Sequence, residues 1–298
     1  MTTTAPPPVA PSVAEGATGA RRPRRSPRPR RSRGPRDLTP ASRVGLGVGV
    51  LWFSILALIP LIAVLVETSQ GGWDAFARAL TTPQTAAAIR LTVVNALGVT
   101  VLNAVMGTVI AWVLVRDRFP GQRILEVLID IPFALPTIVA GLVLLTLYGP
   151  TSPVGVNVAN TQWSVTLALA FVTLPFVVRT VQPVLAELDR DVEEAAASLG
   201  AKPFTVLRRI VLPALVPAIA AGASLSFARG ISEYGSLVLL SGNLPMRTEV
   251  ASVRILAYLE NGDQTSAAAV ATLLLAVSLV ALVTLDVLQR KVASRGTH

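Results

Sequence analysis

Long apolar segments most strongly constrain the fold of this 298-residue chain. Six of them are long enough for a membrane-spanning helix, which needs about 20 residues. They lie near residues 44–66, 91–115, 131–148, 164–186, 214–240 and 266–288. The composition agrees, because 52% of the residues are hydrophobic, 14% are charged and the mean hydropathy is +0.61. An ordinary soluble domain is less apolar. The sequence therefore predicts an all-α polytopic membrane protein with about six transmembrane helices.

The amino-terminal residues 1–43 have a different composition. They hold nine prolines and a basic run from Arg21 to Arg36, with few large apolar side chains. Such a segment cannot bury enough surface to offset its ordering entropy, so we expect a disordered tail. The simplest interpretation is a solvated tail that also orients the first span. Binding to anionic lipid headgroups is the alternative, and nucleic acid or an SH3-type partner is less favoured.

The distribution of basic residues predicts the orientation of the spans. With the amino terminus inside, 21 Lys and Arg residues fall in the tail, in 116–130, in 179–213 and in the last nine residues. The alternate connections hold four: Arg78, Arg90, Arg247 and Arg254. Because cytoplasmic loops retain positive charge, both termini and the 187–213 loop are predicted to be cytoplasmic. The transmembrane domain would occupy 44–290, followed by a cytoplasmic tail at 291–298.

The 187–213 loop carries a spaced motif, E-A-A-x3-G-x9-I-x-L-P. Its seven fixed positions are Glu194, Ala195, Ala196, Gly200, Ile210, Leu212 and Pro213. Asp191 and Glu194 have the spacing of a capping box, Gly200 suits a left-handed helix end, and Pro203 suits the first turn of a second helix. We expect two short helices that form a knob fitting a groove on a soluble partner. The alternative is that Glu194 and Gly200 are only local caps. A DNA-binding helix-turn-helix is disfavoured, because helices this short have no core of their own.

With this motif the chain resembles the permease subunits of bacterial ABC importers with the MetI-like fold, and more closely the CysT-type sulfate/thiosulfate permeases. The resemblance covers about 44–290. Besides the loop motif, it rests on Asp130–Thr137, Ala140–Leu142, Pro175–Pro183, Ser226–Arg229, Glu233–Gly235, Ser241–Asn243 and Arg247–Glu249. The last two segments favour sulfate-type permeases over molybdate relatives.

The resemblance implies a heteromeric importer in the bacterial plasma membrane. Its other members would be a paralogous, CysW-like permease subunit, two ATPase subunits and an extracytoplasmic sulfate-binding protein. ATP and Mg²⁺ would be used by the ATPase subunits, with no cofactor in this chain. The resemblance also implies that Glu194, Ala195, Ala196 and Gly200 belong to the loop that docks on the ATPase.

The fifth apolar segment contains polar residues that an anion route would need. Arg229 and Glu233 lie four residues apart, on one helical face, and Ser226 lies close by. An ionisable residue at membrane depth is a functional-site hypothesis. Two interpretations stay open: an ion pair that fixes helix packing, or an Arg229 that guides the anion. In the third segment, Pro132 and Pro136 predict kinks.

Several other functions are disfavoured. The chain has no cysteine and its single histidine is the terminal residue, so thiolate or histidine metal sites and His-based catalysis are disfavoured. No P-loop pattern occurs, so ATP hydrolysis is expected from separate subunits. A non-ABC channel or transporter is a weaker alternative, because it has no need of a docking loop. A permease for molybdate, tungstate or another oxyanion remains a closer alternative.

Overall fold

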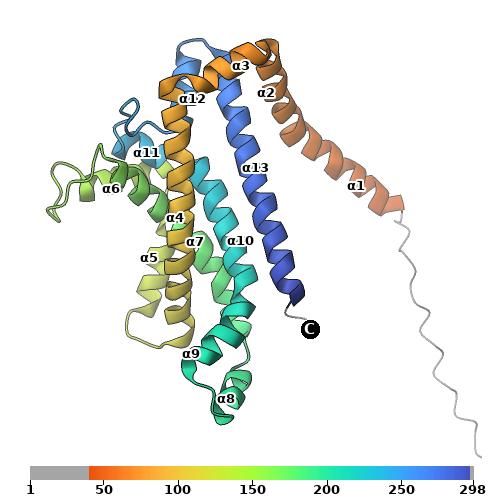
Figure 1. Ribbon diagram of the computed structural model, residues 1–298, viewed down its shortest axis with the longest axis vertical. Coiled ribbons are helices and arrows are strands. Elements are labelled where there is room, and N and C mark those ends of the chain that lie inside the picture. The colour runs from red at the N-terminus through yellow and green to blue at the C-terminus, as the bar shows by residue number, and fades with distance from the viewer. Residues whose placement is uncertain (1–39, 296–298) are drawn as a thin grey trace, which may run out of the picture. The chain divides into compact units, whose positions relative to one another are not determined.

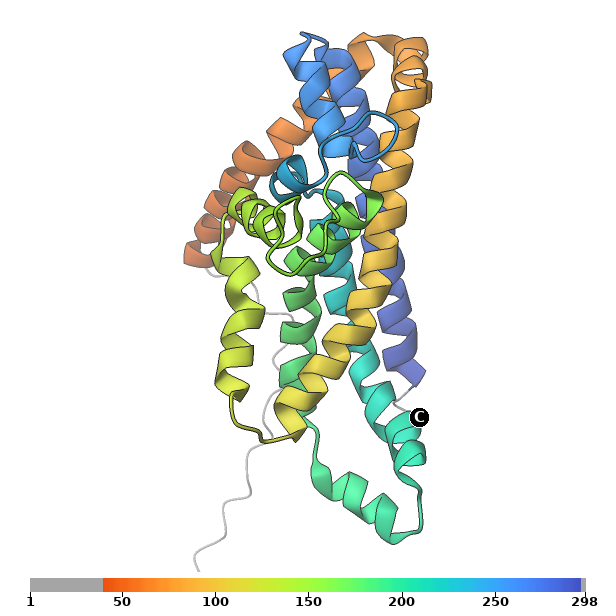
Figure 2. The same ribbon diagram turned by 90° about the vertical axis from the view of Figure 1, so that its left-hand side faces the viewer.

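The computed structural model describes residues 40–295, with side-chain burial for 42–287. The described residues form helices and the loops that join them, and Figures 1 and 2 show the arrangement of the helices that follow Trp52. In chain order the helices are α1 (Pro40–Phe53), a π-helical turn (Ser54–Leu58), α2 (Ile59–Gln70), α3 (Gly72–Thr81), α4 (Pro83–Arg116), α5 (Gln122–Ala134), α6 (Thr137–Tyr148), α7 (Gln162–Glu187), α8 (Arg190–Ser198), α9 (Pro203–Val206), a second π-helical turn (Leu207–Val211), α10 (Leu212–Ile231), α11 (Gly235–Leu240), α12 (Ala251–Glu260) and α13 (Gln264–Arg295). The chain divides into two units at Trp52–Phe53, and the packing given below is that of the second unit.

Five helical segments are long and apolar enough to cross a membrane. They are Ser42–Gln70, Pro83–Arg116, Gln162–Glu187, Pro203–Ile231 and Gln264–Val287. The first matches the predicted span at 44–66, so the helix takes in the last residues of the predicted 1–43 tail. The rest of that tail lies outside the described residues. The last helix continues to Arg295, so the predicted 291–298 tail begins inside it and only 296–298 lie outside the described residues.

The predicted third span at 131–148 is wrong as a single helix. The chain breaks at Leu135 and Pro136, which are extended with ψ 137° each, between α5 and α6. Proline disfavours the helical conformation in the residue before it, which explains the break at Leu135. The 12 residues of α6 rise about 18 Å, well short of the hydrocarbon thickness of about 30 Å.

The predicted fifth span at 214–240 is also two helices. In this segment α10 ends at Ile231, and α11 begins at Gly235. The two short helices α6 and α11 then pack directly on each other. A Cβ added to Gly141 of α6 would lie 2.7 Å from the Ser236 carbonyl oxygen, and one added to Gly235 of α11 would lie 2.9 Å from the Ile138 nitrogen. Only glycine permits this approach of the two backbones.

The long helices α4, α7 and α10 pack around Val177 of α7. A Cβ added to Gly107 of α4 would lie 2.8 Å from Val177 Cβ, and one added to Gly222 of α10 would lie 2.8 Å from Val177 Cα. Small residues at such crossings let membrane helices approach closely. The outward face of α4 stays apolar and exposed, with Val101 and Val105 more than half accessible, which suits contact with lipid or another apolar helix.

The two ends of this unit carry different elements. Both views place α8 and α9 at one end and α3 and α12 at the other (Figures 1 and 2). Arg116 and the 187–213 loop therefore lie opposite Arg78 and Arg254. This separation agrees with the two groups of basic residues defined from the sequence.

Candidate functional site

The loop motif forms a short helix with a defined start. Asp189, not Asp191, is the N-cap of α8: its side chain accepts a hydrogen bond of 2.9 Å from the Asp191 backbone nitrogen. The predicted capping box at Asp191 and Glu194 is therefore wrong by two residues. Asp189 fills the position because its extended backbone (φ −66°, ψ 120°) lets the carboxylate reach the second helical residue. Glu194 is left free of the cap and exposed.

Gly200 ends α8 in the predicted manner. Its φ of +85° is left-handed, the Gly200 nitrogen donates to the Ala197 carbonyl at 2.9 Å, and the Ala201 nitrogen donates to the Ala196 carbonyl at 3.1 Å. These two bonds define a Schellman motif, in which glycine is preferred at this position. A Cβ at Gly200 would meet nothing within 4 Å, so conformation alone, not space, requires glycine here.

The second half of the motif leads into α10. Pro203 begins α9, as predicted, and a π-helical turn from Leu207 to Val211 follows. The turn ends two residues before Pro213, which has no backbone N–H to continue the ladder. Ile210 is half-buried, whereas Leu212 and Pro213 are exposed.

The tip of the loop is apolar and accessible. Leu199 is 90% exposed and Phe204 is 70% exposed. With Glu194 and Ala195, they form an exposed surface at the end of the second unit. Exposed large apolar side chains beside small ones are typical of a surface that another protein covers.

An ion pair that the sequence did not predict connects this loop to α4. An Arg116 Nη2 hydrogen donates to Glu193 Oε1, and the two side chains are 11% and 21% exposed. The guanidinium also lies over the Trp112 ring, 5.5 Å from its centroid. No local pattern indicates this pair, because the two residues are 77 positions apart in the chain.

A second unpredicted ion pair connects α5 and α7. Arg179 Nε donates to Asp130 Oδ1 at 2.8 Å and its Nη2 donates to Oδ2, which makes the pair bidentate. Arg179 Nη1 also donates to Gln182 Oε1 at 2.9 Å. Asp130 and Arg179 both belong to segments that carry the family resemblance, but their spacing alone did not indicate that they meet.

The predicted pair between Arg229 of α10 and Glu233, which lies in the break after α10, does form. Arg229 Nη2 lies 2.7 Å from Glu233 Oε2, without hydrogen-bonding geometry, and the Glu233 side chain has no exposed surface. Glu233 Oε1 accepts hydrogen bonds from the Ser236 nitrogen at 2.9 Å and from Ser236 Oγ at 3.0 Å. The carboxylate therefore holds the break between α10 and α11. Ser226 is also buried, and its Oγ has no hydrogen-bond partner among the described residues.

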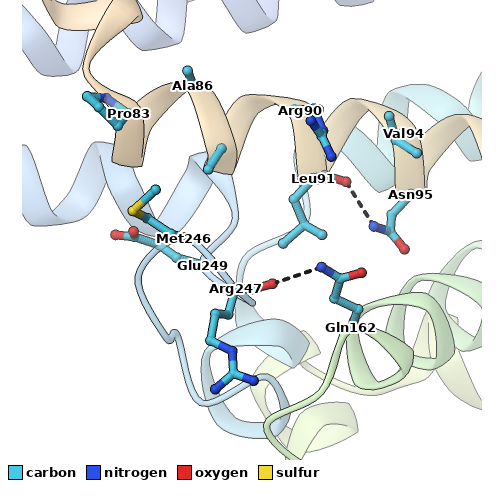
Figure 3. Close-up of a pocket in the computed structure, with 11 residues that line it drawn as sticks. Pro83, Ala86, Arg90, Leu91, Val94, Asn95, Gln162, Met246, Arg247 and Glu249 are labelled. Atoms are coloured by element: carbon cyan, nitrogen blue, oxygen red, sulfur yellow. Dashed lines mark hydrogen bonds between the residues drawn. The ribbon is translucent and has the colours of Figure 1, made fainter.

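A pocket of about 480 Å³ lies at the end opposite α8 and α9. It is formed by the first turns of α4, the loop before α12 and the start of α7 (Figure 3). Its lining residues are Pro83, Ala86, Ala87, Arg90, Leu91, Val94, Asn95, Gln162, Met246, Arg247 and Glu249. From the sequence, Arg90 and Arg247 were predicted to lie on the same side of the membrane, but not in one pocket.

Residues 103–294 match the family described as the inner membrane component of binding-protein-dependent transport systems. The chain belongs to this family. The sulfate transport system permease protein CysT of Salmonella typhimurium is 40% identical over 267 residues, which cover 87% of this chain and 96% of that protein. The CysT protein of Synechocystis is 41% identical over 250 residues, covering 82% and 87%.

Solved structures confirm the family fold. A bacterial ABC transporter that imports the polysaccharide alginate matches with a TM-score of 0.68 at 18% identity, covering 84% of this chain and 94% of that chain. The MetNI methionine ABC transporter matches with a TM-score of 0.52 at 20% identity, covering 69% and 96%. The predicted family and the predicted MetI-like, all-helical permease fold are thus confirmed. The family description is that of a transport component.

Proposed function

We propose that this chain is the permease subunit of an ATP-driven ABC importer for sulfate or thiosulfate. The observation that carries the proposal is the 40% identity to a sulfate permease along 96% of that protein's length. The resemblance includes the two carboxyl-terminal segments Ser241–Asn243 and Arg247–Glu249. In the bacterial plasma membrane, the chain would line the translocation path together with a paralogous CysW-like permease subunit.

The α8–α9 loop is the proposed contact with the ATPase subunits. It is short, it is capped at both ends, and it presents Glu194, Ala195 and Leu199 to solvent. Gly200 sets the turn, while Ile210, Leu212 and Pro213 join the loop to α10. An extracytoplasmic binding protein would deliver the anion at the opposite end of the chain. ATP and Mg²⁺ would act on the ATPase subunits, and both termini would be cytoplasmic.

We further propose that Ser226, Arg229 and Glu233 lie beside the translocation path. Arg229 is 30% exposed while Glu233 is fully buried, so one member of the pair reaches a surface of the chain that a second permease subunit would face. A charge at membrane depth is stable only where a partner or a polar cavity compensates it.

The test is transport by the complete importer reconstituted in vesicles with its binding protein. Radiolabelled sulfate should accumulate only when ATP is supplied, and unlabelled thiosulfate should compete. If unlabelled molybdate or tungstate competed with the radiolabelled sulfate better than unlabelled sulfate does, the substrate would be one of these oxyanions instead. Sulfate flux without ATP would contradict the importer assignment and favour a channel.

A further inference from the structure

The pocket at the outer end of α4 contains two arginines that have no ionic partner. Arg90 and Arg247 are both exposed, and neither forms an ion pair with the residues that the structure describes. They lie on opposite sides of the pocket, and the Arg247 guanidinium points away from Arg90 while its backbone carbonyl faces Gln162 (Figure 3). Arg254 at the same end is engaged differently: its Nε donates to Thr85 Oγ1 at 3.2 Å and its guanidinium lies 4.2 Å from the Tyr258 ring centroid.

Two side-chain amides add donors between these arginines. Asn95 Nδ2 donates to the Leu91 carbonyl at 3.0 Å, and Gln162 Nε2 donates to the Arg247 carbonyl at 3.4 Å. Each amide nitrogen carries two hydrogens, so each keeps one for a ligand. The orientation of Asn95 is fixed because its Oδ1 accepts a bond of 2.7 Å from Thr166 Oγ1.

The single carboxylate of the pocket is turned away from this set of donors. Glu249 Oε2 accepts a hydrogen bond of 2.7 Å from Gln84 Nε2, and the side chain is largely buried. In Figure 3 its carboxylate points to the end of the pocket away from Arg90 and Gln162. The end of the pocket near Arg90 and Gln162 therefore carries positive charge and amide donors, with no carboxylate among the residues that line it, which suits an anionic ligand made of acceptors.

We propose that this pocket is an entry site that holds a hydrated tetrahedral oxyanion dianion before it moves into the membrane. The proposal rests on the function proposed above and deepens it. Arg90, Asn95 and Gln162 supply the donors, and Arg247 adds positive charge. The volume of 480 Å³ leaves room for the anion with several waters, each of which occupies about 30 Å³. Because the donors are exposed to solvent, binding is weak enough for release.

The first experiment uses the absence of native cysteine. Ala87→Cys places one thiol in the pocket, on the same helical face as Arg90 three residues later. The complete importer without binding protein is labelled with an anionic and with a neutral methanethiosulfonate. The ratio of the anionic to the neutral labelling rate should be about tenfold higher for Ala87→Cys than for Asn261→Cys. Asn261 is exposed at the same end but outside the pocket. Adding Arg90→Gln to the Ala87→Cys variant should remove this preference for the anionic reagent.

Sodium sulfate should slow labelling of Ala87→Cys and leave Asn261→Cys unchanged, compared with sodium chloride at equal ionic strength. Failure of sulfate to protect, or an unchanged preference after Arg90→Gln, overturns the entry site. Protection by the substrate-free binding protein but not by sulfate also overturns it, because the arginines would then serve to dock an acidic protein surface.

The second experiment measures uptake. Arg90→Gln and Arg247→Gln should each lower sulfate uptake several-fold, while Arg78→Gln, an exposed arginine at the same end outside the pocket, should match the unmodified chain. Lysine at position 90 or 247 should restore part of the loss, because a charge and donors return. If the unmodified importer takes up no sulfate, the proposed function has failed. If it does and Arg90→Gln takes up sulfate equally well, only the entry site has failed.

Discussion

Arg116, in the last turn of α4, forms an ion pair with Glu193 in the first turn of α8. The pair is mostly shielded from water, and Trp112 covers the guanidinium. It therefore links α8 to α4, the longest described helix. A displacement of α8 by a bound protein would be transmitted to α4 through this contact as well as along the backbone to α10.

A double-mutant cycle tests this connection. Arg116→Gln and Glu193→Gln should each lower sulfate transport per ATP hydrolysed, because α8 would lose its side-chain link to α4. The double variant should be no worse than either single one, with a coupling free energy of about 1–3 kcal/mol in thermal unfolding. Additive losses in both measurements would mean that the two side chains act independently.

The Schellman turn gives a second prediction. Gly200→Ala introduces no clash but forces a left-handed alanine, at about 1–2 kcal/mol. We expect the loop to relax to another shape, so sulfate-dependent ATP hydrolysis and uptake both fall while membrane insertion persists. Gly121→Ala is the matched control, because Gly121 has φ +89° and equally open surroundings in the turn before α5. Equal losses in the two variants would remove any special role for the loop.

Helix packing at Val177 gives a third prediction. Gly222→Ala places a methyl 2.8 Å from Val177 Cα, and such overpacking destabilises by about 1–3 kcal/mol. Gly98→Ala adds the same methyl where nothing lies within 4 Å, and alanine favours helix by up to about 1 kcal/mol. Thermal unfolding of the purified chain in detergent should thus shift down for Gly222→Ala and not for Gly98→Ala. A matching shift in both would contradict the close crossing of α7 and α10.

The Arg229–Glu233 pair gives a fourth prediction. Arg229→Ala alone leaves a buried, unpaired carboxylate, which destabilises by about 3–5 kcal/mol. Adding Glu233→Gln removes that charge and keeps an oxygen for the Ser236 hydrogen bonds, so unfolding of the double variant should approach that of the unmodified chain.

Uptake by the same double variant separates the two interpretations of the pair. If the pair only fixes packing, the stable double variant should transport sulfate normally. We expect a several-fold loss instead, because the proposed path would lack its guanidinium. Normal transport by the double variant would remove Arg229 from the path and leave it a structural role.

The sequence predicted the helical class and the loop because both depend on local signals. Hydrophobic length marks a span, and Gly200 with Pro203 marks where one helix ends and the next begins. The start of α8 was misplaced by a local ambiguity, since Asp189 and Asp191 both suit an N-cap. The break at Pro136 was predicted only as a kink, because apolar residues continue on both sides of it. The break after Ile231 was missed, because Glu233 there is buried and accepts hydrogen bonds from Ser236, a contact that hydropathy does not indicate.

The paired side chains could not be predicted for a different reason. Arg116 meets Glu193 and Asp130 meets Arg179 only after separate helices have packed. Arg229 and Glu233 are only four residues apart, so they meet through local geometry although α10 ends between them, and this pair was predicted. The pocket between Arg90 and Arg247 likewise requires three distant segments to converge.

The packing of α6 against α11 has a consequence for biosynthesis. The helix that follows the backbone break at Leu135 and Pro136 packs on a helix that begins about a hundred residues later, at Gly235. At about 5–20 residues per second, a ribosome needs roughly 5–20 s to reach it. During that interval α6 is too short to span the bilayer and lacks its close contact with α11, although Leu144 packs in the same cluster as Val165 and Leu169 of α7. We expect slower translation between α7 and α11 to increase degradation of the nascent chain.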